Sequence, residues 1–211
     1  MMRHVTFSPV RAILFDFDGV LVDSEPLRFR TGAQALEAIG VRLTWDLFAR
    51  CRLGRPEEAT LRDILGPRFD TEAPGVIARR NAPYEAFLND VPFFPDAERL
   101  LQRFHVLVTV GDYARAKPAS DPFLAAARGV GQPPEACLVI EDSPAGVAAA
   151  KAAGMAVVAA DRRGGSEPLG RPTWAVRSLD ALEISVAGEV IVYGIGRYAD
   201  PLPPDAQPTE E

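Results

Sequence analysis

Two aspartates that follow a short apolar run carry the clearest chemical signal in the sequence. Asp16 and Asp18 come directly after residues 11–15, RAILF, which are typical of a strand buried on both faces. Side chains two residues apart in a strand point the same way, so both carboxylates would face one crevice. Carboxylates that repel each other there favour a bound cation. Gly19 permits a close backbone approach to a ligand, and the alternative is a solvated Asp-Gly turn.

A second acidic pair lies at the end of another apolar run. Glu141 and Asp142 end the segment ACLVIED, which we expect to form a strand parallel to the first. Because parallel strands present their carboxyl ends at one edge of a sheet, both acidic pairs would meet there. Such a cluster repels itself without a metal, and oxygen ligands favour magnesium over zinc or copper. We therefore predict Mg²⁺ as the cofactor.

A lysine and a threonine are candidates to complete a phosphate site at this edge. The run HVLVT ends at Thr109, and Lys117 follows it by eight residues, in a Lys-Pro turn before a helix. The following proline favours an extended Lys117, whose ammonium could neutralise both a carboxylate and a bound phosphate. Taken alone, Lys117 also fits a solvated loop lysine. The eight-residue separation leaves no room for a helix between the two residues.

The elements that would position these residues alternate between strand and helix, with one exception. Residues 25–91 carry apolar residues at helical spacing, as in LRFRTGAQALEAIG, which predicts a small helical cap inserted after the first strand. Residues 1–24 and 92–185 alternate strands with helices, which predicts an α/β core with a doubly wound parallel sheet. Residues 186–211 predict an edge strand, EVIVYGIGRY, and a disordered tail rich in proline and acid.

Composition and charge narrow the range of partners. The chain has 211 residues, of which 47% are hydrophobic and 25% charged, as in a soluble globular protein. Its formal net charge of −6 disfavours nucleic acid or an acidic membrane as the main partner. Two distant cysteines make neither a disulfide framework nor a zinc site. The sequence shows no targeting signal and no apolar run long enough to cross a bilayer, so we expect a cytoplasmic monomer or homodimer.

Three segments of the chain together resemble motifs one, three and four of the haloacid dehalogenase (HAD) superfamily of phosphotransferases: DFDGVLVDSEP, KPASDPFLAAA and IEDSPAGVAAAKAAGM. The helical insert after motif one resembles the cap of the β-phosphoglucomutase and phosphoglycolate phosphatase branch. The resemblance spans roughly residues 11–182 and implies a Rossmann-like core whose cap closes over a substrate. Three motifs in the family's order are a far more specific signal than any one alone.

This resemblance implies a role for each residue at the acidic edge. Asp16 would be the nucleophile that forms an aspartyl-phosphate, and Asp18 the general acid and then the base for water. Lys117 would hold Asp16 and the phosphoryl group by charge. Magnesium would bind Asp16, the backbone carbonyl of Asp18 and Asp142, with Glu141 as a further ligand or directly behind one.

The chain departs from the family at motif two, a strand that normally ends in a serine or threonine whose hydroxyl binds phosphate. In the family a helix and another strand then precede the Lys-Pro turn, whereas here one strand, 105–109, does all of this, so the sheet is shortened. In one interpretation this strand takes the vacant place beside the first strand, and Thr109, Lys117 and Gly19 bind phosphate. Seven extended residues span about 20 Å, enough for both side chains to reach it. In the other interpretation the strand keeps its family position and the site lacks a hydroxyl donor.

Three arginines of the cap are candidate substrate contacts. Arg28 stands where the β-phosphoglucomutase branch usually has a histidine tied to cap closure, which favours a hydrolase over a mutase. Arg52 and Arg55 flank Gly54 in CRLGRPEEATL, which resembles the family's substrate loop. Arginine binds carboxylate and phosphate well, yet each of the three also fits a solvated surface residue.

The predicted function is a magnesium-dependent phosphoric monoester hydrolase that acts on a small phosphorylated metabolite, of the sugar-phosphate or phosphoglycolate type. One alternative is a non-catalytic HAD-like protein that binds a phosphorylated ligand, which the short motif-two region favours. Another is a sugar-phosphate mutase. A receiver-domain regulator fits less well, because its lysine follows its threonine by a whole strand and helix and it has no such cap.

Overall fold

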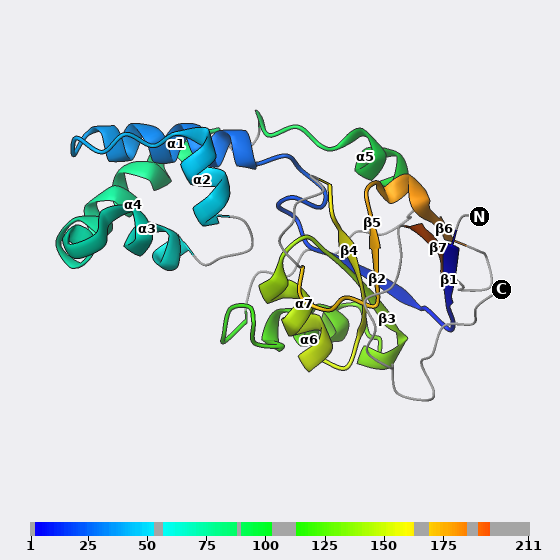
Figure 1. Ribbon diagram of the computed structural model, residues 1–211. Coiled ribbons are helices and arrows are strands. Elements are labelled where there is room, and N and C mark those ends of the chain that lie inside the picture. Colours follow the sequence, from blue (N-terminus) through cyan, green and yellow to red (C-terminus); the bar gives the residue numbers. More distant parts are fainter. Residues whose placement is uncertain are drawn as a thin grey trace. The chain divides into compact units, whose positions relative to one another are not determined.

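The chain divides into two compact units. The structure, a computed structural model, describes residues 3–52, 57–87, 90–102, 113–162, 169–184 and 190–194. One unit comprises residues 1–21 and 94–211, and the other comprises residues 22–93 (Figure 1). The first unit is built on β-strands and the second is helical, so each is described by itself.

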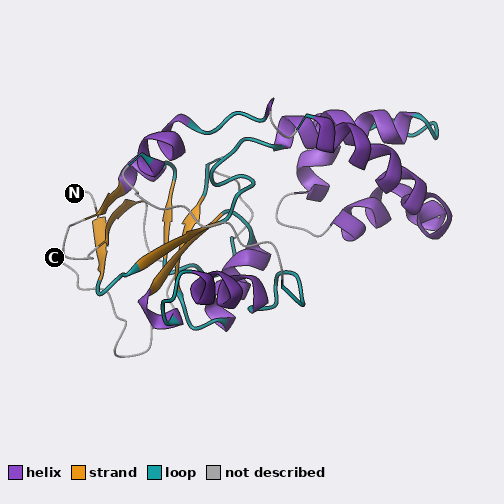
Figure 2. Cartoon of the chain, turned by 180° about the vertical axis from the view of Figure 1, so that it is seen from behind, coloured by secondary structure: helices purple, strands orange, loops and turns teal. Residues whose placement is uncertain are grey.

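A parallel sheet forms the centre of the first unit, as the alternation of strands and helices predicts. Its strands are paired in the order β2 (Ala12–Phe15), β3 (Cys137–Glu141), β4 (Ala156–Ala160) and β5 (Trp174–Val176). All three pairings are parallel. Two helices, α6 (Asp121–Gly129) and α7 (Pro144–Ala152), lie against one face of this sheet (Figures 1 and 2). The α/β fold with a parallel sheet is therefore confirmed.

Strand β3 is the most buried element of this sheet. All five of its residues are buried, the acidic Glu141 included. Small side chains of α7, Ala149 and Ala150, belong to the same buried cluster as Val139 of β3 and Val157 of β4. Close packing of this kind leaves little freedom for the strand's carboxyl end, where Glu141 begins the second acidic pair.

A second, antiparallel sheet belongs to the same unit. Strand β7 (Val190–Gly194) lies between β1 (Arg3–Phe7) and β6 (Leu182–Ile184). The predicted strand near residue 190 therefore exists, but its description as an edge strand is wrong, because it is the middle strand of three. The N-terminal strand that covers one side of it carried no recognised signal. The predicted tail lies outside the described residues.

Short helices complete the first unit. Helix α5 (Pro95–Leu101) begins directly after the second crossing between the units and packs against the 3₁₀ turn η4 (Leu179–Ala181). A further 3₁₀ turn, η3 (Pro134–Ala136), leads into β3. Among the described residues, no helix is long and apolar enough to cross a membrane.

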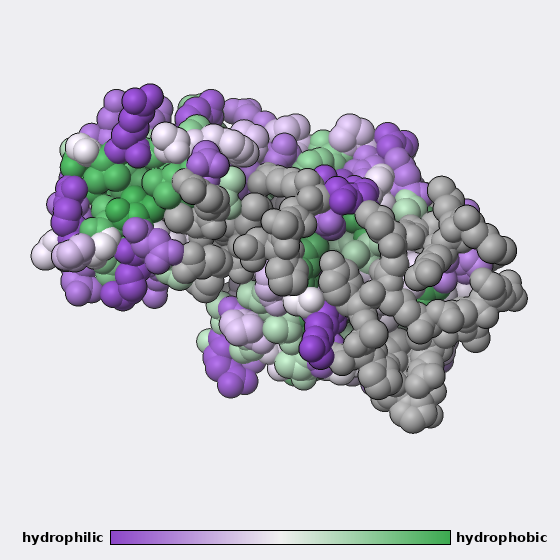
Figure 3. Space-filling model, viewed as in Figure 1, coloured by the Kyte–Doolittle hydropathy of each residue, from purple (hydrophilic) through white to green (hydrophobic). Residues whose placement is uncertain are grey.

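The second unit is entirely helical within the described residues, as residues 25–91 predict. It consists of α1 (Glu25–Glu37), α2 (Trp45–Arg52), α3 (Glu57–Leu65), the 3₁₀ turn η1 (Gly66–Arg68) and α4 (Phe69–Ala86). Its core includes an aromatic cluster of Phe29, Trp45 and Phe48, with ring centroids 5.1–5.6 Å apart. Trp45 is nonetheless 46% exposed, and apolar surface is visible at the left of Figure 3.

Candidate functional site

The two acidic pairs follow neighbouring strands and meet at one edge of the parallel sheet. The backbone N–H of Asp16 donates to Ile140 O at 2.9 Å, which extends the pairing of β2 and β3 by one residue. Oxygen atoms of Asp16, Glu141 and Asp142 all lie within 4.8 Å of one another. The sequence prediction that parallel strands would bring these acids together is thus matched by the geometry.

Lys117 lies in the middle of this acidic group. Its Nζ donates to Asp16 Oδ1 at 2.5 Å and to Glu141 Oε1 at 2.6 Å. The side chain also passes over the ring of Phe123 in α6, with Nζ 4.9 Å from the ring centroid. Burial alone would lower the pKa of Lys117, but the negative charges of Asp16 and Glu141 outweigh burial and raise it. Lys117 is therefore a charged group that links two strand ends, and not a solvated loop lysine.

Glu141 is fully buried and is held from two sides. Besides Lys117, the backbone N–H of Ser143 donates to its Oε2 at 2.6 Å. Ser143 in turn accepts from the backbone N–H of Gly146 at 3.0 Å and so caps α7, as predicted. A Cβ added to Gly146 would come within 1.7 Å of the Glu141 carboxylate, so glycine makes room for the acid beneath the helix. Burial and the neighbouring charge of Asp16 raise the pKa of Glu141, although Lys117 opposes this.

Gly19 is required by its conformation and by its neighbour. Its φ of +76° lies in the left-handed region that favours glycine. A Cβ at this position would lie 1.9 Å from Asp142 Oδ2, so any other residue would displace that carboxylate. The structure thus places Gly19 against an acid of the cluster, whereas its predicted contact with phosphate stays a prediction.

The donor set suits a divalent cation that prefers oxygen. Three carboxylates gather here, two of them paired with the ammonium of Lys117, and like charges this close are stable only when a cation is near. Carboxylates without imidazole or thiolate are the ligands of magnesium or calcium and not of zinc or copper. Asp18 contributes no carboxylate to this group of three, and its predicted roles, as a metal ligand through its backbone carbonyl and as the general acid, stay predictions.

Other predicted site residues fall in different parts of the chain. Thr109 and Arg55 lie outside the described residues, so both interpretations of motif two stay predictions. Arg52 is the last residue of α2. Arg28 belongs to α1, where its Nε donates to Ser24 Oγ at 3.4 Å and its guanidinium lies 5.1 Å from the centroid of Tyr84.

The helical unit holds a pocket of its own, of about 320 Å³. The pocket lies near the first and last residues of the helical unit. It is lined by Asp23, Pro26, Leu27, Arg30, Phe87, Asp90, Val91 and Pro92. Arg30 stacks over the ring of Phe87 at 4.9 Å. Arg28, the predicted cap arginine whose side chain the structure describes, does not line this pocket.

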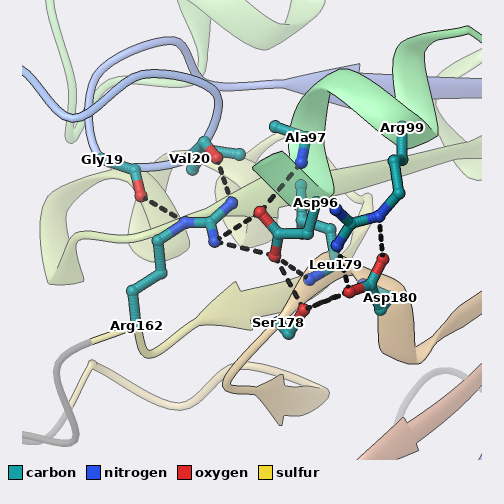
Figure 4. A network of polar contacts seen from close by, with 9 residues as sticks. All are labelled: Gly19, Val20, Asp96, Ala97, Arg99, Arg162, Ser178, Leu179 and Asp180. Atoms are coloured by element: carbon teal, nitrogen blue, oxygen red, sulfur yellow. Dashed lines mark hydrogen bonds and ion pairs between the residues drawn. The ribbon is translucent and has the colours of Figure 1, made fainter. Parts of the chain in front are cut away.

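A second charged cluster in the first unit was missed by reading the sequence. Asp96 and Arg162 form a buried ion pair, and Arg162 also donates to the backbone carbonyls of Gly19 and Val20 (Figure 4). The available signal was the position of Arg162, directly after the carboxyl end of β4 and hence at the same sheet edge as the acids. Asp96 has no comparable signal, since an acid in the first turn of a helix is usually solvated.

A parallel sheet with a helical insert after its first strand, and with acids and a lysine at the strand ends, defines a class of α/β phosphotransfer proteins. A sequence model of the haloacid dehalogenase-like hydrolase family matches residues 95–154. The chain is 26% identical over 187 residues to β-phosphoglucomutase of Bacillus subtilis, covering 71% of this chain and 82% of that one. It is 29% identical over 178 residues to a phosphorylated carbohydrates phosphatase of Thermotoga maritima, covering 69% and 82%.

One further relative matches over a small part of its own length, and a solved structure shares the fold. The chain is 31% identical over 190 residues to the chloroplastic protein SUPPRESSOR OF QUENCHING 1 of Arabidopsis thaliana, covering 71% of this chain but only 18% of that protein. The solved structure of β-phosphoglucomutase from Clostridium difficile shares the fold, with a TM-score of 0.65 at 21% identity over 82% of this chain and 93% of that one. The family model and these relatives make the chain similar to haloacid dehalogenase-like hydrolases of the branch that includes β-phosphoglucomutase, which agrees with the resemblance of its motifs.

Proposed function

We propose that this protein is a magnesium-dependent phosphatase of small phosphorylated metabolites, which acts through an aspartyl-phosphate on Asp16. The observation that carries the proposal is the contact of Lys117 Nζ with both Asp16 and Glu141, inside a group of three carboxylates. Relatives named as phosphatases support hydrolysis of phosphoric monoesters. The sugar-phosphate or phosphoglycolate class of substrate is supported by the chain's similarity to proteins named β-phosphoglucomutase and phosphoglycolate phosphatase.

The residues at the sheet edge suit each step of this chemistry. An oxygen of Asp16 attacks phosphorus, the bond from phosphorus to the ester oxygen breaks, and Asp18 gives its proton to that leaving oxygen. Water then attacks phosphorus, its proton passes to Asp18, and the bond between phosphorus and Asp16 breaks. Lys117 orients Asp16 through its hydrogen bond and adds positive charge beside the phosphoryl oxygens.

The carboxylates of Asp16 and Asp142, with the carbonyl of Asp18, are the groups that would hold magnesium, and Glu141 would support them from the buried side. A bound Mg²⁺ supplies charge that lets an anionic nucleophile approach an anionic phosphate. Gly19 leaves the space that the Asp142 carboxylate occupies. The turn that follows Asp18 is therefore also the turn that makes room for Asp142.

Mutase activity on a sugar phosphate is the second candidate, because β-phosphoglucomutase of Bacillus subtilis matches over most of its length. The position of Arg28 counts against it. An arginine stacked near Tyr84 and bonded to Ser24 replaces the histidine that the mutase branch uses there. A third candidate, a ligand-binding protein without turnover, follows from the short motif-two region.

The test is phosphate release from p-nitrophenyl phosphate and from a panel of sugar phosphates and phosphoglycolate, with and without Mg²⁺. We expect magnesium-dependent release that is lost in Asp16→Asn, together with no interconversion of glucose phosphate isomers. Isomer interconversion would favour the mutase. Stabilisation by Mg²⁺ and phosphate with no turnover of any compound would favour the binding protein and overturn the proposal.

A further inference from the structure

Arg162 uses every nitrogen of its guanidinium in a contact with the first unit. Nη1 donates to both oxygens of Asp96, at 2.9 and 2.8 Å. Nε donates to the carbonyl of Gly19 at 3.1 Å, and Nη2 donates to the carbonyl of Val20. The guanidinium also stacks on Phe94, 3.8 Å from the ring centroid. Figure 4 shows the hydrogen bonds to Asp96, Gly19 and Val20 converging on the guanidinium.

Asp96 fixes the orientation of this arginine. Its carboxylate also accepts from the backbone N–H of Ala97 at 2.8 Å, from Ser178 Oγ at 2.8 Å and from the backbone N–H of Leu179 at 2.7 Å. Burial alone would raise the pKa of Asp96, but these donors and Arg162 lower it, so the acid stays ionised. An acid held at five points cannot swing, and the arginine bonded to both of its oxygens is held with it.

The two carbonyls that Arg162 binds follow immediately after Asp18. Gly19 is thus held at two points, since its carbonyl accepts from Arg162 while its Cα lies against the carboxylate of Asp142. The Gly19 carbonyl lies in the peptide that joins Gly19 to Val20, so a shift of either contact would change the backbone torsion angles of Gly19 and rotate the preceding peptide, which joins Asp18 to Gly19. That rotation would displace both the side chain of Asp18 and its carbonyl. The planar guanidinium of arginine can donate to Asp96 and to both carbonyls at once, whereas the ammonium of a lysine cannot make all of these contacts in a fixed geometry.

We propose that Arg162, oriented by Asp96, is a positioning residue of the phosphoryl-transfer site, which fixes the turn at residues 19–20 and thereby the general acid Asp18. This inference rests on the proposed function. Arg162 also stacks on Phe94, the first residue after the chain returns from the helical unit, and Phe94 N–H donates to Leu21 O at 2.9 Å. Arg162 therefore contacts the first unit at both places where the chain passes between the units, near Val20 and at Phe94.

The inference predicts that Arg162→Lys depends on the leaving group. Phenolate from phenyl phosphate needs a proton from Asp18 far more than p-nitrophenolate does. We expect kcat/KM for phenyl phosphate to fall about 10-fold to 100-fold, and that for p-nitrophenyl phosphate only about 2-fold to 5-fold. A loss of folded protein would lower both values equally, so the ratio of the two reports on positioning. Asp96→Asn should give the same selective loss if the lysine variant folds poorly.

Arg99→Ala is the matched control. Arg99 pairs with Asp180 beside the same network, at 2.6 Å from Nη2 to Oδ2, but it is exposed and does not contact the turn at 19–20 (Figure 4). We expect its kcat/KM ratio to equal that of the wild type. Suppose that the wild type turns over both esters and that this activity needs Asp16. If Arg162→Lys and Asp96→Asn then keep the wild-type ratio of the two kcat/KM values, the positioning role is overturned and the proposed function is not. No turnover of either ester by the wild type would instead overturn the proposed function, and this inference with it.

Discussion

Two charged clusters lie at the same edge of the core and differ in their balance of charge. The first gathers the carboxylates of Asp16, Glu141 and Asp142, with the ammonium of Lys117 paired to Asp16 and Glu141. The second joins one carboxylate to one guanidinium, with side chains only 8% and 12% exposed, and backbone donors and acceptors complete it. A balanced cluster stabilises a conformation, whereas an excess of negative charge prepares a site for a cation and an anionic substrate. The balance of charge therefore indicates that the first cluster is the one suited to the chemistry.

The comparison is tested most strongly by Lys117→Met, which removes the only cation of the first cluster among the described contacts. We expect phosphate release to fall by about 10²–10³-fold, because the positive charge beside the phosphoryl group is lost. The measurement is kcat for p-nitrophenyl phosphate at saturating Mg²⁺. The variant should also unfold more easily, since buried Glu141 loses a partner. Activity within tenfold of the wild type would show that Lys117 is structural.

Substitution in the second cluster should change stability more than cation binding. Asp96→Asn leaves the guanidinium of Arg162 buried without a counter-charge, which we expect to cost about 3 kcal/mol of unfolding free energy. Urea denaturation measures this loss directly. A variant as stable as the wild type would mean that the ion pair contributes little and that the amide satisfies the same donors.

Magnesium should distinguish the clusters by its effect on stability. At a concentration about 100 times its dissociation constant, a cation that binds only the folded state stabilises it by about 2.7 kcal/mol. We expect Asp142→Asn, which loses a carboxylate of the proposed ligand set, to need about 10-fold to 100-fold more Mg²⁺ than the wild type for the same gain, and Asp96→Asn, which keeps every carboxylate of that set, to need a smaller increase. Thermal unfolding across a magnesium titration gives all three values. Equal responses in Asp142→Asn and the wild type would place the cation elsewhere.

Much of the first cluster could be predicted from the sequence because it follows from local rules. A buried run that ends in acids is a strand, and parallel strands share an edge, so Asp16 and Glu141 had to approach each other. Lys117 was placed by its resemblance to a motif, and its contacts agree. The α/β fold itself followed from the alternation of strand and helix.

The second cluster and the second sheet could not be predicted in the same way. Asp96 and Arg162 are 66 residues apart, and neither stands in a pattern that names its partner. Strand β1 pairs with β7 from opposite ends of the chain, and the register of such a pair depends on tertiary packing and not on local sequence. Reading β7 as an edge strand failed because its second neighbour, β1, was not recognised.

The smallest expected effect is the contribution of Asp96 to acid stability. Its folded pKa lies below the ordinary value of 3.8, since Arg162, Leu179 N–H and Ser178 Oγ outweigh the opposing effect of burial. The stability from this shift is therefore fully present above the ordinary pKa and is lost as the pH falls through the folded one. The difference in unfolding free energy between the wild type and Asp96→Asn should stay constant above about pH 5. Below about pH 4 it should shrink by at most about 1.4 kcal/mol per pH unit, the limit for one proton. A difference that stays constant down to pH 2 would mean that the network does not lower the pKa of Asp96, so that the ionisation of Asp96 adds no pH-dependent stability to the cluster.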